Sequence, residues 1–383
     1  MTGRKAVKPD PGLWLPLLDA YELTSLPRDT VLRGSLRAGL EPESPEVQDV
    51  LARWPAAAYL DRVVTGTDVV LVYQVKDDPP ARPLLHVVLL VATLITTLGS
   101  GALMLGIDPF NTRMLGGGGL DLPYPTAFHP RRLLAGASFA LPFLGMLFLH
   151  EMGHWVAARI HRVRASLPYF IPFPPYLSVI GSLGAFIRLQ GPTIRRSVMF
   201  DIGAAGPFAS FLVALPMFAV GIGLSEPVPG STGFQSPFLI QFFGQPVWLG
   251  GSALSWGLAE LFGPPEFGER LILLHPLALA GWLGFFVTAL NLLPLGQLDG
   301  GHVLYALVPA RHGTVARLFL LCLVPLGLLW WAWAVLILVI HRGRVEHPSV
   351  IQPGPDPGFG RQMLGWALIA IFFLTFVPVP IAL

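Results

Sequence analysis

The residue types best suited to catalysis occur together, directly after a long apolar stretch. Residues 133–149 are seventeen residues without a charge, and His150, Glu151 and His154 follow at once. Residues four apart lie on one face of a helix, so the two histidines can present ring nitrogens to one metal ion. Zinc suits this set, because it accepts imidazole ligands and makes water acidic enough for a glutamate to deprotonate. The spacing H-E-x-x-H is typical of zinc-dependent peptide hydrolysis.

A third metal ligand is expected elsewhere in the chain, because a catalytic zinc ion usually has three protein ligands and one open position. Residues 291–301, NLLPLGQLDGG, end a second uncharged run and supply Asp299. A proline and a glycine in this segment should interrupt the helix and leave Asn291 near the site. Asp299 could instead cap a new helix at the membrane edge. Because two histidines alone would leave the ion one ligand short, we favour His150, His154 and Asp299 as the zinc ligands.

The composition places these residues in a membrane protein. Of 383 residues, 53% are hydrophobic and only 13% are charged, against about 25% charged residues in soluble proteins. Six stretches are long and apolar enough to cross a hydrocarbon layer of ~30 Å as helices. A net charge of +2 without a basic block predicts no nucleic-acid partner, and a single cysteine excludes a disulfide scaffold. The expected spans are approximately 84–106, 133–160, 201–224, 275–308, 315–341 and 362–383.

Residues 1–83 are expected to form a small, soluble N-terminal α/β domain. They contain 10 Lys/Arg and 12 Asp/Glu, which is 22 of the 48 charged residues in the chain. A strand is predicted at Val69–Val75, after a turn. No removable targeting segment is predicted, because the apolar stretch near the N-terminus is too short. Residues 84–383 would then form the membrane domain.

Two segments of the membrane domain do not fit regular spans. Four prolines in Leu167–Gln190 forbid a regular helix, and Val179–Leu189 predicts a glycine-bearing hairpin or loop at membrane depth. Such backbone is tolerated there only where protein or water covers it. Pro237–Gly263 is apolar but broken by glycines and a proline, so it should lie in the interface or dip in and return. The expected fold is an all-α polytopic membrane protein of about six transmembrane helices, with a membrane-associated β-hairpin.

The direction of the spans decides whether the two halves of the metal site can meet. His150 lies ~25 Å and Asp299 ~33 Å along their helices at ~1.5 Å per residue, both toward the C-terminal ends. If Pro237–Gly263 crosses the membrane zero or two times, the two helices run parallel and end in the same leaflet. That side carries more Lys/Arg, so the positive-inside rule places it in the cytoplasm. Three arginines would fall on the opposite face: Arg342, Arg344 and Arg361.

The two segments together resemble the signature of the site-2 protease family, which are intramembrane zinc metalloproteases. In that family, H-E-x-x-H lies on one helix of a three-helix catalytic core and N-x-x-P-x-x-x-L-D-G on the third. The phrase GQLDGGH at 296–302 resembles the plastid and cyanobacterial branch, and no PDZ-like insert is seen. The matching residues are His150, Glu151, His154, Asn291, Pro294, Leu298, Asp299 and Gly300.

The resemblance implies a role for each matching polar residue. His150, His154 and Asp299 would bind one Zn²⁺ per chain, and Glu151 would act as the general base. Asn291 would help to hold the substrate or the oxyanion of the transition state. The reaction implied is hydrolysis of a peptide bond within or near a transmembrane segment of a membrane-protein substrate.

The resemblance also extends to the predicted hairpin. The segment from Gly181 to Gly184 resembles a family element that receives the unwound substrate strand, which fits addition of a peptide to a strand edge. The implied partners are a transmembrane protein substrate and the lipid bilayer, and no oligomeric state is predicted. The expected location is a bacterial inner (plasma) membrane, with the zinc site toward the cytoplasmic side.

Two other functions fit parts of the sequence. A catalytically silent scaffold or chaperone of the same fold would keep zinc without turnover, but the intact Glu151 argues against it. A metal transporter would place His and Asp residues along a pathway through the membrane. Here the candidate ligands concentrate at one depth, which favours a catalytic site.

Overall fold

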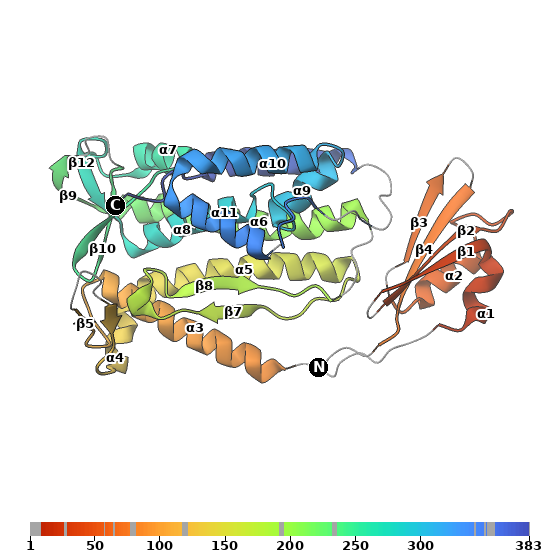
Figure 1. Cartoon of the computed structure of the whole chain (residues 1–383), viewed down its shortest axis with the longest axis horizontal. Helices are drawn as coiled ribbons and strands as arrows, with labels where there is room; N and C mark the ends of the chain where they lie inside the picture. The colour runs from red at the N-terminus through yellow and green to blue at the C-terminus, as the bar shows by residue number, and fades with distance from the viewer. Residues whose placement is uncertain are drawn as a thin grey trace.

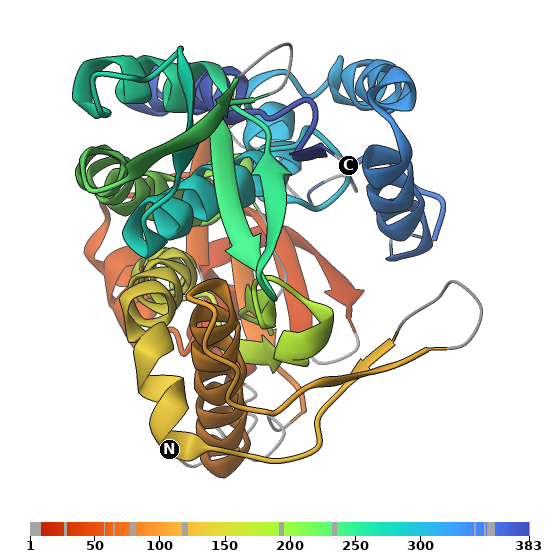
Figure 2. The ribbon, with the colours of Figure 1, turned by 90° about the vertical axis from the view of Figure 1, so that its left-hand side faces the viewer.

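The chain forms a sheet domain at one end, a bundle of helices in the middle and a second sheet at the other end (Figure 1). In the end-on view, the helices of the bundle lie behind the strands of the second sheet (Figure 2). The computed structural model describes residues 9–26, 29–56, 58–63, 66–76, 82–116, 122–190, 195–231, 236–340, 342–347, 350 and 357–382.

Three helices form the centre of the bundle. Helices α5 (Ala137–Ile160) and α8 (Pro276–Asn291) both pack against α6 (Arg196–Gly223). Small residues let the backbones approach closely: a Cβ added at Gly153 would lie 2.6 Å from the carbonyl oxygen of Ala205. The helix that carries the H-E-x-x-H motif is therefore fixed against α6 at close range.

The expected span 275–308 is divided at the second motif. Helix α8 ends at Asn291, and α9 (Asp299–Leu307) begins after a loop. The loop contains Pro294, and Gly296 adopts a positive φ of 52°, a conformation that favours glycine. Asp299 thus starts a new helix, close to where the preceding helix ends.

Six regular transmembrane helices are not confirmed. Within the described residues, three helical segments are long and apolar enough to cross a membrane: Pro83–Met104 (α3), Pro130–Ile160 and Arg196–Gly223. The expected span 362–383 is helical only as α12 (Phe359–Thr375), after which the chain adds a short strand to a sheet. The membrane domain also contains three sheets, so the all-α description is incomplete.

The expected single span 315–341 is wrong. The chain breaks at the short turn Val324–Leu326 and at Gly327, whose φ is 100°. This break separates α10 (His312–Leu323) from α11 (Leu328–Ile340). Each helix is only about 20 Å long at ~1.5 Å per residue, shorter than a full crossing. The sequence predicted one span because the whole stretch is apolar. Hydropathy alone does not show that the chain reverses direction at this turn.

Both ends of the α10–α11 hairpin lie at the end of the bundle where α6 begins. Arg317, in the first half of α10, pairs with Glu346, beyond the end of α11, at 3.0 Å. Arg361, at the start of α12, makes two bonds of 2.7 Å to Asp201, in the first turns of α6. The expected placement on the opposite face is therefore wrong for three arginines: Arg342, Arg344 and Arg361.

Cysteine labelling can test this reversal. In a Cys322→Ser background, cysteines at Arg311 and Arg344 should react with an impermeant maleimide from the same side of sealed vesicles. A cysteine at Glu226, beyond the other end of α6, should react only from the opposite side. Labelling of positions 311 and 344 from opposite sides would restore a single crossing.

The stretch Pro237–Gly263, expected to lie in the interface or to dip in and return, forms strands and a short helix in a cap at one end of the bundle. It contains strands β10 (Phe238–Phe242) and β11 (Gln245–Leu249) and a ten-residue helix, α7 (Ala253–Phe262). A helix of ten residues is ~15 Å long, about half of what a crossing requires. The two strands belong to a five-stranded sheet of order β13-β11-β10-β12-β9. The other strands are β9 (Glu226–Ser231), β12 (Arg270–Leu273) and β13 (Ile381–Ala382).

This cap returns the chain to the side from which it came. The last turn of α6 lies against the first turn of α8, because a Cβ added at Gly221 would lie 2.2 Å from the backbone nitrogen of Ala278. The segment between them therefore makes no net crossing. Helices α5 and α8 run in the same direction, as the metal site requires.

The predicted hairpin is present beside the central helices. Strand β7 (Tyr169–Pro172) pairs antiparallel with β8 (Ser182–Phe186), and in Figure 1 the pair runs along α5 and α3. Gly181 precedes β8 with a φ of 73°. A Cβ there would lie 2.4 Å from the carbonyl oxygen of Thr96 in α3. Only glycine fits this close approach, so Gly181 anchors the hairpin to α3.

The N-terminal part is an antiparallel sheet of order β1-β2-β4-β3. One face is covered by a helix, whose Val47 and neighbouring Trp54 pack on Leu32 and Leu71. The strand predicted at Val69–Val75 lies mainly in β4. The elements are α1 (Pro11–Trp14), β1 (Leu18–Ser25), β2 (Asp29–Leu36), α2 (Pro45–Arg53), β3 (Ala58–Val63) and β4 (Gly66–Gln74).

The sheet contacts the helix bundle through polar and aromatic groups. Arg195, which precedes α6, lies 4.6 Å from the ring centroid of Tyr59 and donates to the carbonyl oxygen of Leu60 at 2.9 Å. Arg164, which precedes the hairpin, forms an ion pair with Asp29 of β2. Burial raises the pKa of Tyr59, and Arg195 opposes this shift. The N-terminal domain thus touches both chain segments that lead into and out of the hairpin.

Candidate metal centre

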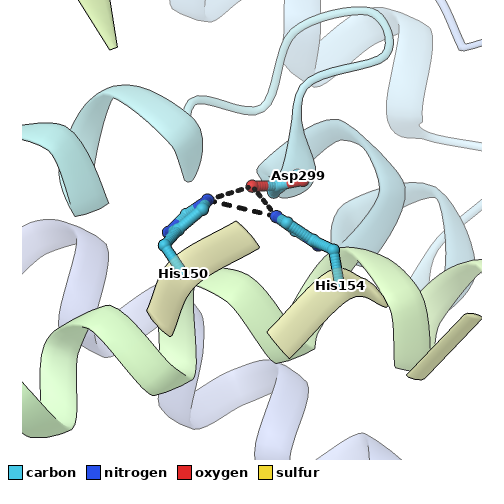
Figure 3. Close-up of side chains that lie close together, drawn as sticks. All are labelled: His150, His154 and Asp299. Atoms are coloured by element: carbon cyan, nitrogen blue, oxygen red, sulfur yellow. Dashed lines mark hydrogen bonds and ion pairs between the residues drawn. The ribbon is translucent and has the colours of Figure 1, made fainter. Parts of the chain in front are cut away.

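The three predicted ligands meet in the interior of the helix bundle. His150 and His154 lie one turn apart on α5, and Asp299 reaches them from the start of α9 (Figure 3). The two Nε2 atoms are 3.1 Å apart, and Asp299 Oδ2 lies 3.5 Å from His150 Nε2 and 3.3 Å from His154 Nε2. Both histidines are buried, with 2% and 7% of their surface exposed.

This donor set fits zinc. A tetrahedral zinc ion with bonds of ~2.1 Å holds its donor atoms ~3.4 Å apart, close to the three distances observed. Two imidazole nitrogens and one carboxylate oxygen also form a usual catalytic zinc set with one position left open. Within the described part of the chain, this is the one group of His, Cys, Asp and Glu side chains close enough to hold a metal ion.

The outer nitrogen of each histidine has a defined partner. His154 Nδ1 lies 2.6 Å from the carbonyl oxygen of Ile202. A carbonyl only accepts, so His154 carries its proton on Nδ1 and presents the lone pair of Nε2 to the metal position. His150 Nδ1 lies 3.1 Å from the hydroxyl of Ser210, whose oxygen is 3.0 Å from that of Thr288. Partners of this kind orient metal ligands and fix their tautomers.

Glu151 lies on α5, the helix that carries both histidines, and its side chain is near the hairpin. It is 5% exposed, and its carboxylate lies near the backbone of Ile187, one residue beyond β8. A carboxylate buried this deeply beside two histidines is a candidate for proton transfer to or from a group bound at the three predicted ligands.

Asn291 also reaches the metal ligands. Its Nδ2 lies 3.2 Å from His150 Nε2, so the last residue of α8 borders the candidate metal position. The two hairpin glycines take different places. Gly181 packs on α3, and a Cβ at Gly184 would meet open space. The contact between the hairpin and the site passes through Ile187 instead.

His302 lies one turn after Asp299 but turns toward a different neighbour. Its Nδ1 lies 2.8 Å from Nε2 of His347, and its Cβ lies against Gly203 of α6. His302 is therefore not grouped with the three ligands.

Gly206 of α6 makes room for the metal site. A Cβ added there would lie 2.1 Å from His154 Nε2 and 2.5 Å from its Cε1. No Cβ can occupy that position beside the ligand. Sequence reasoning missed Gly206 as well as Ser210 and Thr288. The available signal was a glycine and isolated hydroxyls inside otherwise apolar helices, which is common in membrane proteins.

Part of the chain is similar to known peptidases. Residues 138–323 match Peptidase family M50. The chain is 34% identical over 253 residues to the probable zinc metalloprotease EGY1, chloroplastic, of Arabidopsis thaliana, covering 64% of this chain and 43% of the relative. It is 28% identical over 263 residues to the probable zinc metalloprotease EGY2, chloroplastic, of the same plant, covering 67% and 44%. No solved structure matches.

The similarity covers part of each relative. The chain spans less than half the length of these relatives, since the matches cover 43% and 44% of them. The family match includes both H-E-x-x-H and Asp299, so all three ligands lie within it.

Proposed function

We propose that the chain is an intramembrane zinc metalloprotease of the site-2 protease type, because residues 138–323 match Peptidase family M50. Its proposed reaction is hydrolysis of a peptide bond within or near a transmembrane segment of another membrane protein. The observation that carries the proposal is the meeting of three ligand atoms 3.1–3.5 Å apart, on helices separated by 145 residues of chain, with Glu151 beside them.

The proposed roles follow from the position of each side chain. Zinc held by His150, His154 and Asp299 would supply Lewis-acid chemistry, polarising a peptide carbonyl and making water more acidic. Glu151 would take a proton from the attacking water and pass it to the leaving amine. The amide of Asn291, at the edge of the metal position, would hold the substrate carbonyl or the developing oxyanion.

The hairpin is the proposed docking strand for the substrate. A helical substrate must unwind before hydrolysis, because its hydrogen-bonded carbonyls are shielded from attack. Strand β8 pairs with β7 on one edge, and within the described residues no strand pairs with its other edge. An unwound substrate could add to that edge through main-chain hydrogen bonds. The contact from Ile187 to Glu151 would then bring the bound strand beside the general base.

The two alternative functions gain no support from the site. A metal transporter needs ligands along a path, and the described residues offer one group only. A silent scaffold would not need a buried carboxylate next to the ligands, yet Glu151 is both present and buried.

The proposed location is a plastid-type membrane. The bacterial inner membrane expected from the sequence is not supported, because the similar proteins are named as chloroplastic. The arginines that precede and follow the α10–α11 hairpin lie at the end of the bundle where α6 begins. We therefore assign this end to the side of the membrane that the positive-inside rule predicts for loops rich in Lys and Arg.

Zinc content tests the proposal without a known substrate. Purified wild type should contain about one zinc ion per chain, and Asp299→Ala should lose it or bind it far more weakly, because two histidines alone leave the ion short of a ligand. Asp49→Ala, an exposed acid on α2, is the matched control and should keep its zinc. Zinc-free wild type, or zinc unaffected by Asp299→Ala in a folded protein, would refute the site.

A further inference from the structure

A buried pair of hydroxyls lies behind one of the metal ligands. Ser210 on α6 and Thr288 on α8 are both fully buried, with 0% of their surface exposed. Ser210 Oγ contacts three atoms: His150 Nδ1 at 3.1 Å, Thr288 Oγ1 at 3.0 Å and the carbonyl oxygen of Pro207 at 3.1 Å. These contacts link α5, α6 and α8 at the ring nitrogen of His150 that faces away from the metal position.

The donors and acceptors of these groups can all be paired in one arrangement of hydrogen bonds. A serine hydroxyl can donate one hydrogen bond and accept two. If Ser210 donates to the carbonyl of Pro207, which can only accept, then Thr288 and His150 Nδ1–H can both donate to Ser210. Every polar atom of the three side chains in this buried region is then paired, as buried polar groups require.

The opposite tautomer of His150, with its proton on Nε2, is less compatible with metal binding. If Ser210 donated to a bare Nδ1, the proton of His150 would sit on Nε2, which points at His154 Nε2 and Asp299. That proton would occupy the nitrogen that must bind the metal. The hydroxyl pair therefore matters because it can accept from Nδ1 and leave Nε2 free.

We propose that Ser210, supported by Thr288, is a positioning residue that holds His150 in its metal-binding tautomer and rotamer. The counterpart for His154 is the backbone carbonyl of Ile202, which needs no particular side chain. The two histidines are thus oriented by different means, and only the partner of His150 can be removed by mutation. This inference rests on the proposed zinc site.

The test measures zinc affinity by competition with a chromophoric chelator in detergent, with thermal unfolding as a check on folding. Ser210→Ala should weaken zinc binding about 10–100-fold, the usual effect of losing a partner of a metal ligand. Thr288→Val should weaken it less, because Ser210 remains, and Thr288→Ser should restore the affinity by keeping the hydroxyl. Thr375→Val is the matched control, since this buried hydroxyl bonds only to the backbone of its own helix.

The double variant separates positioning from general loosening of the bundle. If Thr288 acts through Ser210, then Thr288→Val added to Ser210→Ala should cost nothing further, whereas independent structural effects would add. In metal-free wild type, ¹⁵N NMR of labelled histidine should show His150 protonated at Nδ1, with His150→Gln identifying the signal. Ser210→Ala should produce a mixture of tautomers.

The outcomes distinguish this inference from the proposed function. Wild type without zinc would refute the zinc site itself. Zinc-binding wild type with an unchanged affinity in folded Ser210→Ala, or additive losses in the double variant, would refute only the role of Ser210. Should Ser210→Ala fail to fold, the comparison of Thr288→Val with Thr288→Ser decides the same question.

Discussion

Glu151→Gln should leave zinc binding intact and lower cleavage of a transmembrane substrate by about 10²–10⁴-fold, the usual contribution of a general base. The change keeps the size of the side chain and one of its two oxygen acceptors. It removes only the ability to take a proton from water. Zinc content and cleavage of a co-reconstituted single-span substrate are the two measurements.

The control for this variant is Glu260→Gln, an exposed glutamate on α7 at the far end of the bundle. It should cleave at the wild-type rate. Cleavage by Glu151→Gln at a similar rate would remove Glu151 from the proton-transfer role. Loss of zinc in that variant would instead make Glu151 a ligand.

Gly206→Ala should destroy the metal site while changing a residue that bears no functional group. The new Cβ would lie 2.1 Å from His154 Nε2, a distance that no pair of unbonded atoms can hold. Either α6 must move away from α5 or the His154 ring must turn. A displacement of about 1 Å at a reactive centre can cost on the order of 10²-fold in rate, and we expect a loss of at least this order in both zinc affinity and cleavage.

Gly145→Ala is the matched control on the ligand helix itself. A Cβ at Gly145 would meet no atom within 4 Å, and alanine favours a helix by up to about 1 kcal/mol over glycine. That variant should keep its zinc and fold at least as well as wild type. Full zinc binding by Gly206→Ala would show that the contact between α5 and α6 can open without disturbing His154.

The chemistry of the site could be predicted from the sequence, because it depends on residue types at fixed spacing. Two histidines four residues apart in a helix must share a face, whatever surrounds them. An aspartate at the end of an uncharged run needs a partner in a membrane. Counting spans was enough to place His150 and Asp299 in the same leaflet, and the structure brings them within 3.5 Å.

The architecture around the site was predicted less well, because apolar composition does not distinguish a crossing from a reversal. The stretch 315–341 has the hydropathy of one span, yet a turn at Gly327 makes it a hairpin. Pro237–Gly263 is equally apolar but forms strands and a short helix in a cap that buries Phe238. In both cases, tertiary packing supplied partners for residues that the sequence assigned to lipid.

The sequence by itself predicted a membrane protein with a zinc-binding helix, a general base and a distant third ligand. Motif spacing and hydropathy are local properties, and they are readable without a fold. Only the tertiary structure decided what surrounds the ligands: Gly206 gives His154 its space, and Ser210 faces the outer nitrogen of His150. These contacts join different helices, so their geometry exists only once α5, α6 and α8 have packed together.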